Sequence, residues 1–339
     1  MLRFGVLGLG FMGRTHLASL ARQPGVTVVS VHDPEPDRLG GSLAAGGGNL
    51  EIAGGAWDDS KVRRCASAEE IIQDEGIDAV VVAVPTYLHA ELSSAVLAAG
   101  KHVFCEKPMA LTLRDCDRMI AAARKAERVL MIGHCLRFWG EYAAAAEIVK
   151  TRQFGRLRSI IMSRRGGVPG FGARGWFTDH TKSGGALLDL HIHDVDYALF
   201  VLGKPESVQA RGDVGPSGGI DRVVSWFDYG SEGPIVQMEG SWMAGAGVPF
   251  VMSFRMYFEA ASLVYSSDSR RPMQLYSDAA HDVDVSAVSA YEAEMRQFIR
   301  CVQLGMDSNV VPPESSRQAV ALALAEAKSV RTGRPVEVD

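Results

Sequence analysis

The sequence of 339 residues has little of what marks several classes of protein. It has only five cysteines and no C-x-x-C pair, so we expect reduced, mostly buried thiols. No apolar run approaches the roughly 18 residues that span a bilayer, and the first residues show no secretory signal pattern. The net charge of −5 argues against nucleic acid or an anionic membrane as a main partner. We therefore expect a globular protein of the cytoplasm.

The first 33 residues run in the order strand, glycine-rich turn, helix, strand, acid. The apolar run Leu2–Leu7 predicts a buried parallel strand. Phe11–Arg22 predicts a helix, and the β-branched run Val26–Val31 predicts a second strand. The turn between the first strand and the helix reads Gly-x-Gly-x-x-Gly. This order is typical of a dinucleotide-binding unit.

Each glycine of this turn has its own task. Gly8 permits the tight turn, Gly10 lets the backbone approach a pyrophosphate, and Gly13 lets the helix pack closely on the strand. The first turn of the helix, with Phe11 and Met12, presents its N–H groups to the phosphates. A mere structural turn is the alternative, because glycine-rich turns are common.

The acid at the end of the second strand bears on the choice of coenzyme. Asp33 lies 20 residues beyond Gly13, where a carboxylate accepts hydrogen bonds from the adenosine ribose. A carboxylate there would repel the 2′-phosphate of NADP, so we expect NAD. Arg38 lies close enough in sequence to leave NADP open.

Two further strands are expected to deliver polar groups to the same edge of the sheet. They are Asp78–Val84 and His102–Cys105. The ligand crevice of a doubly wound sheet lies beyond the carboxyl ends of its strands. The residues expected to face the cofactor there are Pro85, Thr86, His89, Glu106 and Lys107.

Lys107 is the residue of this edge that we expect to do chemistry. A cation in the crevice could polarise a substrate oxygen, whereas a solvated loop lysine is the alternative. Pro108 restricts Lys107 to an extended backbone and could make the peptide bond cis.

The character of the chain changes after the expected helix Leu111–Lys125 and a last strand, Val129–Gly133. Glycine-rich turns then separate strand-like runs, which predict an antiparallel sheet. These runs are Arg158–Arg164, Ser207–Gly212, Asp221–Asp228, Ile235–Trp242, Val251–Phe258 and Ser262–Tyr265. We expect an α/β domain at 1–125, with a doubly wound parallel sheet, and an α+β domain at 126–339. Glycines at 40–41 and 46–48 predict a surface loop.

One helix of the second domain carries a candidate acid–base pair. Residues Ser183–Phe200 place four apolar side chains at helical spacing, and Gly203 provides a stop. Asp189 and His193 are four residues apart and so lie on one helix face. A carboxylate beside an imidazole raises its basicity, which suits a general base. A surface or capping pair is the alternative.

A metal site is not expected on this helix. His191 and His193 are two residues apart and point about 200° apart around a helix. Asp189 and His193 could supply two ligands, but the sequence shows no third. We expect His191 to be a packed core histidine.

Together these motifs resemble the Gfo/Idh/MocA oxidoreductases, a family that includes glucose–fructose oxidoreductase and inositol dehydrogenases. The segments that carry the resemblance are Gly8–Gly13, Val84–His89, Glu106–Pro108, Gly184–Asp194, Tyr291–Ile299, Ser315–Ser329 and Thr332–Val336. Ser183 stands where many members have a glycine, and Phe177 follows Trp176 where many have an arginine. The combination of Glu-Lys-Pro with Asp-x-x-x-His is far more specific than the glycine motif.

The resemblance implies a catalytic trio of Lys107, Asp189 and His193, which would also bind substrate. His193 would take the proton of a substrate hydroxyl, and Lys107 would hydrogen-bond the same oxygen. Asp189 would orient the substrate hydroxyls and His193. Arg137 occupies a position that often lines the site, with a surface arginine as the alternative. The resemblance also implies a nucleotide-binding Rossmann domain and an open sheet that forms homodimers or homotetramers.

The function expected is NAD(P)-dependent oxidation of a secondary alcohol of a sugar, inositol or related polyol. A non-sugar cyclic or aromatic diol is a second substrate class. A dinucleotide-binding sensor without turnover is the alternative from another class, and the intact trio argues against it.

Overall fold

A computed structural model describes residues 1–39, 61–170, 173–245 and 247–338, so the expected loop at 40–48 lies outside the described residues. The chain forms two compact units. The first comprises Met1–Cys135, Pro169–Trp176 and Ala290–Arg317, and the second comprises Leu136–Val168, Phe177–Ser289 and Gln318–Asp339. This division differs from the boundary expected after residue 125. No helix in the described part of the chain is long and apolar enough to cross a membrane.

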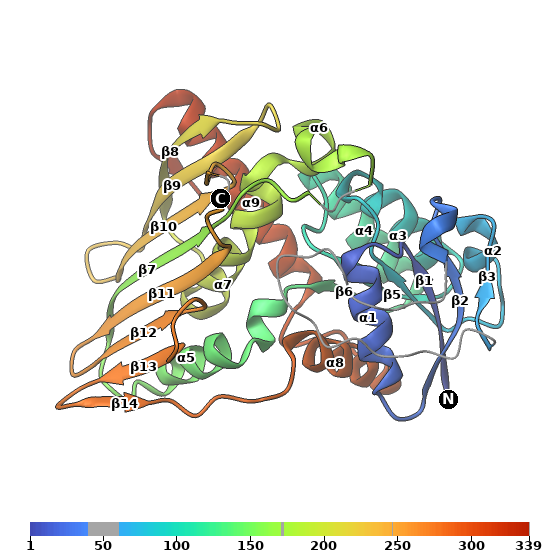
Figure 1. Cartoon of the computed structure of the whole chain (residues 1–339), viewed down its shortest axis with the longest axis horizontal. Coiled ribbons are helices and arrows are strands. Elements are labelled where there is room, and N and C mark those ends of the chain that lie inside the picture. Colours follow the sequence, from blue (N-terminus) through green and yellow to red (C-terminus); the bar gives the residue numbers. More distant parts are fainter. Residues whose placement is uncertain (40–60, 171–172, 246, 339) are drawn as a thin grey trace. The chain divides into compact units, whose positions relative to one another are not determined.

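The first unit contains a six-stranded sheet in the order β3-β2-β1-β4-β5-β6, and every neighbouring pair is parallel (Figure 1). This is the strand order of a doubly wound dinucleotide-binding fold, as predicted. Its central strand β4 is buried at every position and entirely apolar, as expected of a strand covered on both faces. In chain order the strands are β1 (Leu2–Leu7), β2 (Val26–His32), β3 (Arg63–Arg64), β4 (Ala79–Val82), β5 (His102–Glu106) and β6 (Leu130–Gly133).

Helices from distant parts of the chain cover this sheet. They are α1 (Phe11–Ala21), α2 (Ala68–Ile72), α3 (His89–Ala98), α4 (Leu113–Ala126) and α8 (Ala290–Leu304). The last of these, α8, packs against α1, and α3 packs against α4. Phe298 of α8 lies edge-on to Phe4 and Phe104, with ring centroids 6.2 and 5.7 Å away. Aromatic packing therefore makes a segment near residue 300 part of the first unit's core.

The second unit contains a nine-stranded sheet in which β10 and β7 form a parallel pair and the other neighbouring strands are antiparallel. All six predicted strands are confirmed, while β13, β14 and β15 were not predicted. The order across the sheet is β14 (Ala280–Asp282), β13 (Met273–Tyr276), β12 (Ser262–Ser266), β11 (Val251–Phe258), β7 (Leu157–Arg165), β10 (Ile235–Ser241), β9 (Ile220–Asp228), β8 (Ser207–Val214) and β15 (Val336–Glu337).

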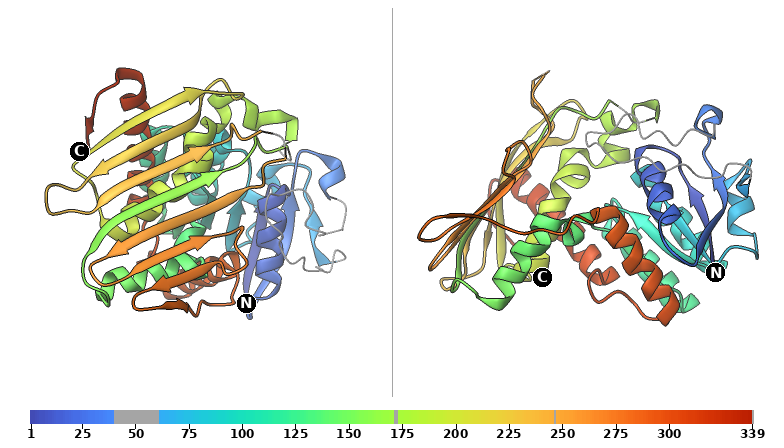
Figure 2. Two further views of the ribbon diagram at one scale, coloured as in Figure 1. Left: turned by 60° about the vertical axis from the view of Figure 1, so that its left-hand side comes forward. Right: turned by 60° about the horizontal axis from the view of Figure 1, so that its bottom comes forward.

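The two faces of this sheet differ. On β9 the side chains of Val223, Ser225 and Phe227 are buried, and those between them are more exposed. Figure 2 shows helices α5 (Gly140–Thr151) and α7 (Ile192–Leu202) on one face, while the opposite face carries no described helix of this unit. The remaining helices are α6 (His180–Ser183) and α9 (Pro313–Thr332). One face is thus packed and the other open, which explains the alternating pattern.

Candidate functional site

The carboxyl ends of the strands β1, β2, β4 and β5 lie at the same edge of the first sheet. Leu7 of β1 pairs with His32 of β2 and with Val82 of β4, and Val82 in turn pairs with Cys105 of β5. Neighbouring strands lie about 4.8 Å apart. The glycine turn, Asp33, and the segments after β4 and β5 therefore start at the same edge, as the sequence predicted.

The glycine turn is closed by backbone on both sides. Gly8 has a φ of +91°, and a Cβ there would lie 2.4 Å from the carbonyl oxygen of Ala83. A Cβ on Gly13 would lie 1.9 Å from the carbonyl oxygen of Gly8. The predicted tight turn and close helix packing are thus confirmed, because no other residue fits at either position.

The turn is open where a pyrophosphate would approach. A Cβ on Gly10 would meet a single atom within 4 Å, a guanidinium nitrogen of Arg38 at 3.7 Å. Gly10 is the N-cap of α1 and offers no side-chain acceptor, and the first turn, with Phe11 and Met12 half-buried, contains no acid. A helix N-terminus with this composition favours an anion. The residues present therefore fit the phosphates of a dinucleotide.

Asp33 is 4% exposed and fastens the glycine turn to the end of β2. Its Oδ2 accepts the N–H of Leu9 at 2.7 Å, and its Oδ1 accepts the N–H of Glu35 at 2.9 Å. A carboxylate oxygen has two lone pairs, so each can accept a second hydrogen bond. A guanidinium nitrogen of Arg38 lies 3.6 Å from Oδ2. The structure thus adds a structural task to the predicted coenzyme contact.

The segment after β4 places Thr86 and His89 in buried positions, with Pro85 half-buried. His89 is 1% exposed, and its Nδ1 and Nε2 lie 2.8 and 2.9 Å from the carbonyl oxygens of Pro108 and Val84. Burial lowers the pKa of His89, against the smaller opposing effect of these carbonyls. The ring therefore links the segments that follow β4 and β5, a task that sequence reasoning did not foresee.

Glu106 and Lys107 stand at the end of β5. Glu106 is 6% exposed, and its Oε1 lies 2.6 Å from Nε2 of His16 on α1. Burial alone would raise the pKa of Glu106, but the hydrogen bond and charge of His16 and the charge of Lys107 outweigh it and lower that pKa. Lys107 is half-buried, and its peptide bond to Pro108 is cis, one of the two forms that the sequence allowed.

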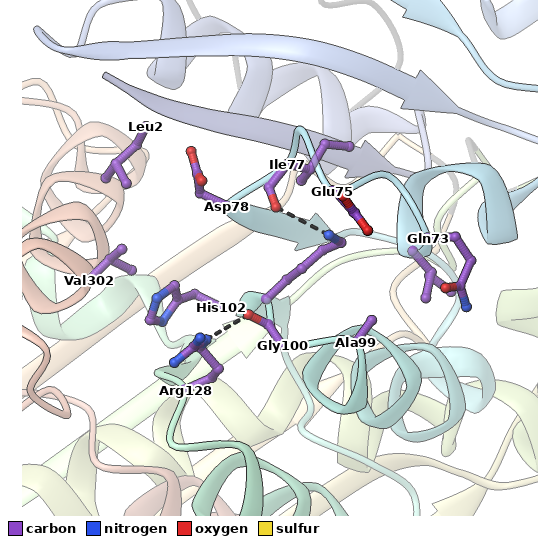
Figure 3. Close-up of a pocket in the computed structure, with 12 residues that line it drawn as sticks. Leu2, Gln73, Glu75, Ile77, Asp78, Ala99, Gly100, His102, Arg128 and Val302 are labelled. Carbon is purple, nitrogen blue, oxygen red and sulfur yellow. Dashed lines mark hydrogen bonds between the residues drawn. The ribbon is translucent and has the colours of Figure 1, made fainter.

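A groove of about 590 Å³ lies at the other edge of the first sheet, at the amino ends of its strands (Figure 3). Leu2, Asp78 and His102 line it. Its Lys101 donates to the carbonyl oxygens of Asp74 and Ile77, and its Arg128 donates to that of Gly100. Because Lys101 and Arg128 donate their hydrogen bonds to backbone carbonyl oxygens, we do not expect the groove to bind an anion. It is distinct from the edge that carries the glycine turn.

The predicted helix of the second unit is interrupted. The segment forms α6, two glycines with positive φ, a π-helical turn at Leu187–His191, and then α7. The buried carboxylate of Asp221 fixes the start of the π turn by accepting the N–H of Ala186 at 3.0 Å. The hydroxyl of Ser183 accepts the N–H of Gly185 at 3.0 Å. π turns occur often at functional sites.

Asp189 and His193 are the only residues from 185 to 199, all of them described, that are not buried. The predicted core face of this helix is confirmed, with Leu188, Ile192, Val195 and Leu199 all buried, and Gly203 caps its end. The wider π turn still leaves positions four apart on one side of the helix. The second unit thus presents one acid and one imidazole from a helix that is otherwise packed.

The other ionisable groups of this helix have partners inside the unit. His191 is fully buried, as predicted, and its Nε2 lies 3.0 Å from Oε1 of Glu326. Burial alone would lower the pKa of His191, but the charge and hydrogen bond of Glu326 raise it. Asp194 pairs with Arg164 at 2.9 Å. These contacts hold the helix in place and leave Asp189 and His193 as its accessible ionisable groups.

The side chain of Arg137 is buried and paired with a buried carboxylate. Its guanidinium donates two hydrogen bonds to Asp196, at 2.9 and 2.6 Å, and lies 5.0 Å from the ring centroid of Phe200. Only 2% of its side chain is exposed. The alternative of a surface arginine is therefore wrong, and this enclosed pair does not fit the expected role of substrate ligand.

The structure groups the predicted residues by unit. The first unit holds the cofactor candidates together with Lys107, and the second holds Asp189 and His193. Sequence reasoning missed the partners Asp221, Glu326 and His16. His16 stands three residues beyond Gly13 on a helix of known phase, and that spacing was an available signal.

Two family models match most of the chain. The oxidoreductase family with an NAD-binding Rossmann fold matches residues 2–134, and the GFO/IDH/MocA C-terminal domain matches residues 142–264. Among curated proteins, the myo-inositol 2-dehydrogenase of Thermotoga maritima is 28% identical, with 100% of this chain and 99% of the relative covered. The 1,5-anhydro-D-fructose reductase of Ensifer adhaerens is 26% identical, with 100% and 99% covered.

Solved structures share the fold over the full length. A probable dehydrogenase from Thermotoga maritima is 26% identical with a TM-score of 0.80, and 99% of each chain is covered. Levoglucosan dehydrogenase in complex with NADH and levoglucosan superposes with a TM-score of 0.84 at 20% identity, again with 99% of each chain covered. The second likeness is evidence for the fold alone.

Proposed function

This chain belongs to the GFO/IDH/MocA oxidoreductases, and on that premise we propose that it oxidises a secondary alcohol of a sugar, inositol or related polyol with NAD. The observation that carries the proposal is that Asp189 and His193 are half-buried on a helix whose other residues from 185 to 199 are all buried. An acid and an imidazole four residues apart are suited to accept a hydroxyl proton.

The printed names of the relatives support a polyol. Full-length relatives are named for myo-inositol and 1,5-anhydro-D-fructose. Both are cyclic polyhydroxy compounds or their close derivatives. We therefore propose a cyclic polyol as the substrate class.

The first unit is proposed to bind the coenzyme through the edge that carries the glycine turn. Gly10 leaves the backbone open, and the first turn of α1 offers N–H groups for the pyrophosphate. The carboxylate of Asp33 would accept hydrogen bonds from the ribose and disfavour a 2′-phosphate. Bound NAD supplies the hydride acceptor. Pro85, Thr86 and Glu106, at the neighbouring strand ends, complete the proposed coenzyme edge.

The catalytic roles follow from the chemistry of three side chains. His193 takes the proton from the substrate hydroxyl as the carbon gives up its hydride. Asp189 orients the imidazole of His193 and the hydroxyl groups of the substrate. Lys107 is the proposed contribution of the first unit, hydrogen-bonding the substrate oxygen and stabilising the negative charge that develops there.

We also propose that the chain forms a homodimer or homotetramer through the open face of the second sheet. Large apolar side chains stand on that face, with Trp226, Ile235 and Tyr257 exposed by 42%, 70% and 39%. Such side chains are enriched in protein interfaces. Sedimentation should show an oligomer that Trp226→Lys with Tyr257→Lys dissociates. A monomer before substitution would contradict the proposal.

We place the reaction in the cytoplasm, because the five cysteines, all in the described part of the chain, are buried and form no disulfide. The test of the proposed function is NAD reduction by the purified full-length chain across inositols, cyclic sugars and non-sugar diols. Turnover with a cyclic polyol supports the proposal. A preference for aromatic diols would replace the substrate class, and coenzyme binding without any turnover would favour a sensor.

A further inference from the structure

Three ionisable side chains meet inside the first unit, directly beneath Lys107. His16 comes from α1, Glu106 from the end of β5 and Glu294 from α8. Their ligand-type atoms lie within 4.8 Å of one another, and the three residues are 0%, 6% and 0% exposed. The ring of His16 is enclosed by Phe104 at 4.9 Å between centroids. Glu106 also belongs to the proposed coenzyme edge, whereas His16 and Glu294 have no part in the function proposed above.

The spacing within the cluster fits a hydrogen bond better than a shared metal ion. Nε2 of His16 and Oε1 of Glu106 are 2.6 Å apart, whereas two ligands on a tetrahedral zinc ion lie about 3.3 Å apart. The imidazole therefore donates its Nε2–H to the carboxylate. Charge-assisted hydrogen bonds of this kind are short and strong.

The second oxygen of the same carboxylate reaches the proposed catalytic lysine. Oε2 of Glu106 accepts the backbone N–H of Lys107 at 3.2 Å. Gly133 on β6 leaves room for this arrangement, because a Cβ there would come within 3.2 Å of Oε1. One carboxylate thus joins an imidazole on α1 to the backbone from which the Lys107 side chain projects.

Glu294 completes the cluster as a neutral acid. Burial, followed by the charge of Glu106, raises the pKa of Glu294 well above its ordinary value. Neither of its oxygens has a hydrogen-bond partner among the described residues. A second carboxylate charge beside Glu106 in a dry interior would be costly, so this neighbour is protonated.

We propose that His16 is a positioning residue for Lys107. His16 holds the ionised carboxylate of Glu106, and that carboxylate fixes the backbone of Lys107. Glu294 lies beside this contact as a neutral acid. The inference rests on the role of Lys107 in the proposed function. The groups that face Glu106 are His16 on α1, His89 on α3, Lys107 and Glu294 on α8. Among these, His16 makes the direct contact to the carboxylate.

Amide hydrogen exchange at Lys107 tests the positioning without any substrate. In full-length His16→Phe, which cannot donate, the Lys107 amide should exchange about tenfold faster relative to that of Phe104. His16→Gln, whose amide can still donate, should restore slow exchange. His102→Phe removes a histidine from the other end of β5 and should leave the ratio unchanged.

Turnover of the best polyol gives the second measurement. His16→Phe should lower kcat about tenfold with little change in KM, which is the pattern of a misplaced catalytic group. Because His16 holds the pKa of Glu106 low, its removal should also move the acid limb of the kcat profile to higher pH. If His16→Phe does not fold, Glu106→Ala, which removes the acceptor of the Lys107 N–H, carries the same expectations for exchange.

The outcomes separate the two proposals. Faster exchange at Lys107 with no polyol oxidised by the wild-type chain supports the positioning role and contradicts the proposed function. Unchanged exchange in folded His16→Phe or Glu106→Ala overturns the positioning role, whatever the activity.

Discussion

The carboxylate of Asp33 accepts the backbone N–H of Leu9 with an N···O distance of 2.7 Å. A residue expected to select the coenzyme thus also fastens the turn that is proposed to bind its phosphates. A guanidinium nitrogen of Arg38 lies 3.6 Å from this carboxylate. We therefore expect these two side chains to set the coenzyme preference.

Asp33→Asn should shift the coenzyme preference toward NADP. The amide oxygen can still accept the N–H of Leu9, so the turn should persist, while the charge that repels a 2′-phosphate is lost and Arg38 is released. We expect the ratio of NADP to NAD dissociation constants to fall about tenfold, or about 1.4 kcal/mol. Calorimetric titration of both coenzymes measures it. Adding Arg38→Ala should reverse the gain, and an NADP preference in the wild-type chain would contradict this account.

Arg137→Ala should destabilise the second unit strongly. The substitution leaves the carboxylate of Asp196 buried without its bidentate partner, which costs about 3–5 kcal/mol. Denaturant unfolding of the variant measures this cost. Arg124→Ala is the matched control, since its ion pair with Glu314 is exposed and should contribute at most about 1 kcal/mol. An equal loss of unfolding free energy in the two variants would show that the buried Arg137–Asp196 pair contributes no more to stability than an exposed ion pair.

Glu294→Gln should stabilise the protein increasingly as the pH rises. The pKa of Glu294 is raised in the folded state. Its contribution to the free energy of unfolding is therefore complete below the unfolded-state pKa of about 4.3, and it is lost as the pH rises through the folded-state pKa. Glutamine has no proton to lose. The stability difference between variant and wild type should therefore grow between about pH 5 and 8, by up to about 1.4 kcal/mol per pH unit.

Urea unfolding at several pH values measures this difference. Glu147→Gln on α5 serves as the control, because 62% of that side chain is exposed and its substitution should give no such trend. A difference between Glu294→Gln and wild type that stays constant with pH would mean that Glu294 is ionised in the folded protein.

Local patterns predicted much of this fold. The run from β1 through Asp33 was predictable because each step depends on neighbouring residues. The main strands of the second sheet were predictable because one packed face imposes alternation. The alanine-rich segment within α5 has high helix propensity and could have predicted that helix. The strands β13, β14 and β15 are short and partly exposed, and so give little pattern.

The contacts that set the site come from long range and gave no local signal. The π turn depends on Asp221, 35 residues from the Ala186 N–H that it accepts. The imidazole of His191 meets Glu326 across 135 residues, and that of His16 meets Glu106 across 90. Such partners are brought together only by the complete fold, so the sequence could propose candidate site residues but not the contacts that hold them.

The kinetics of His193→Ala test the central claim most directly. With the best cyclic polyol and saturating NAD, kcat should fall roughly 10²–10⁴-fold, as expected for loss of a general base, while the NAD dissociation constant is unchanged. His281→Ala, which replaces an exposed histidine on β14, should behave as wild type. Unchanged turnover in folded His193→Ala would contradict the assignment of His193 and, with it, the proposed mechanism.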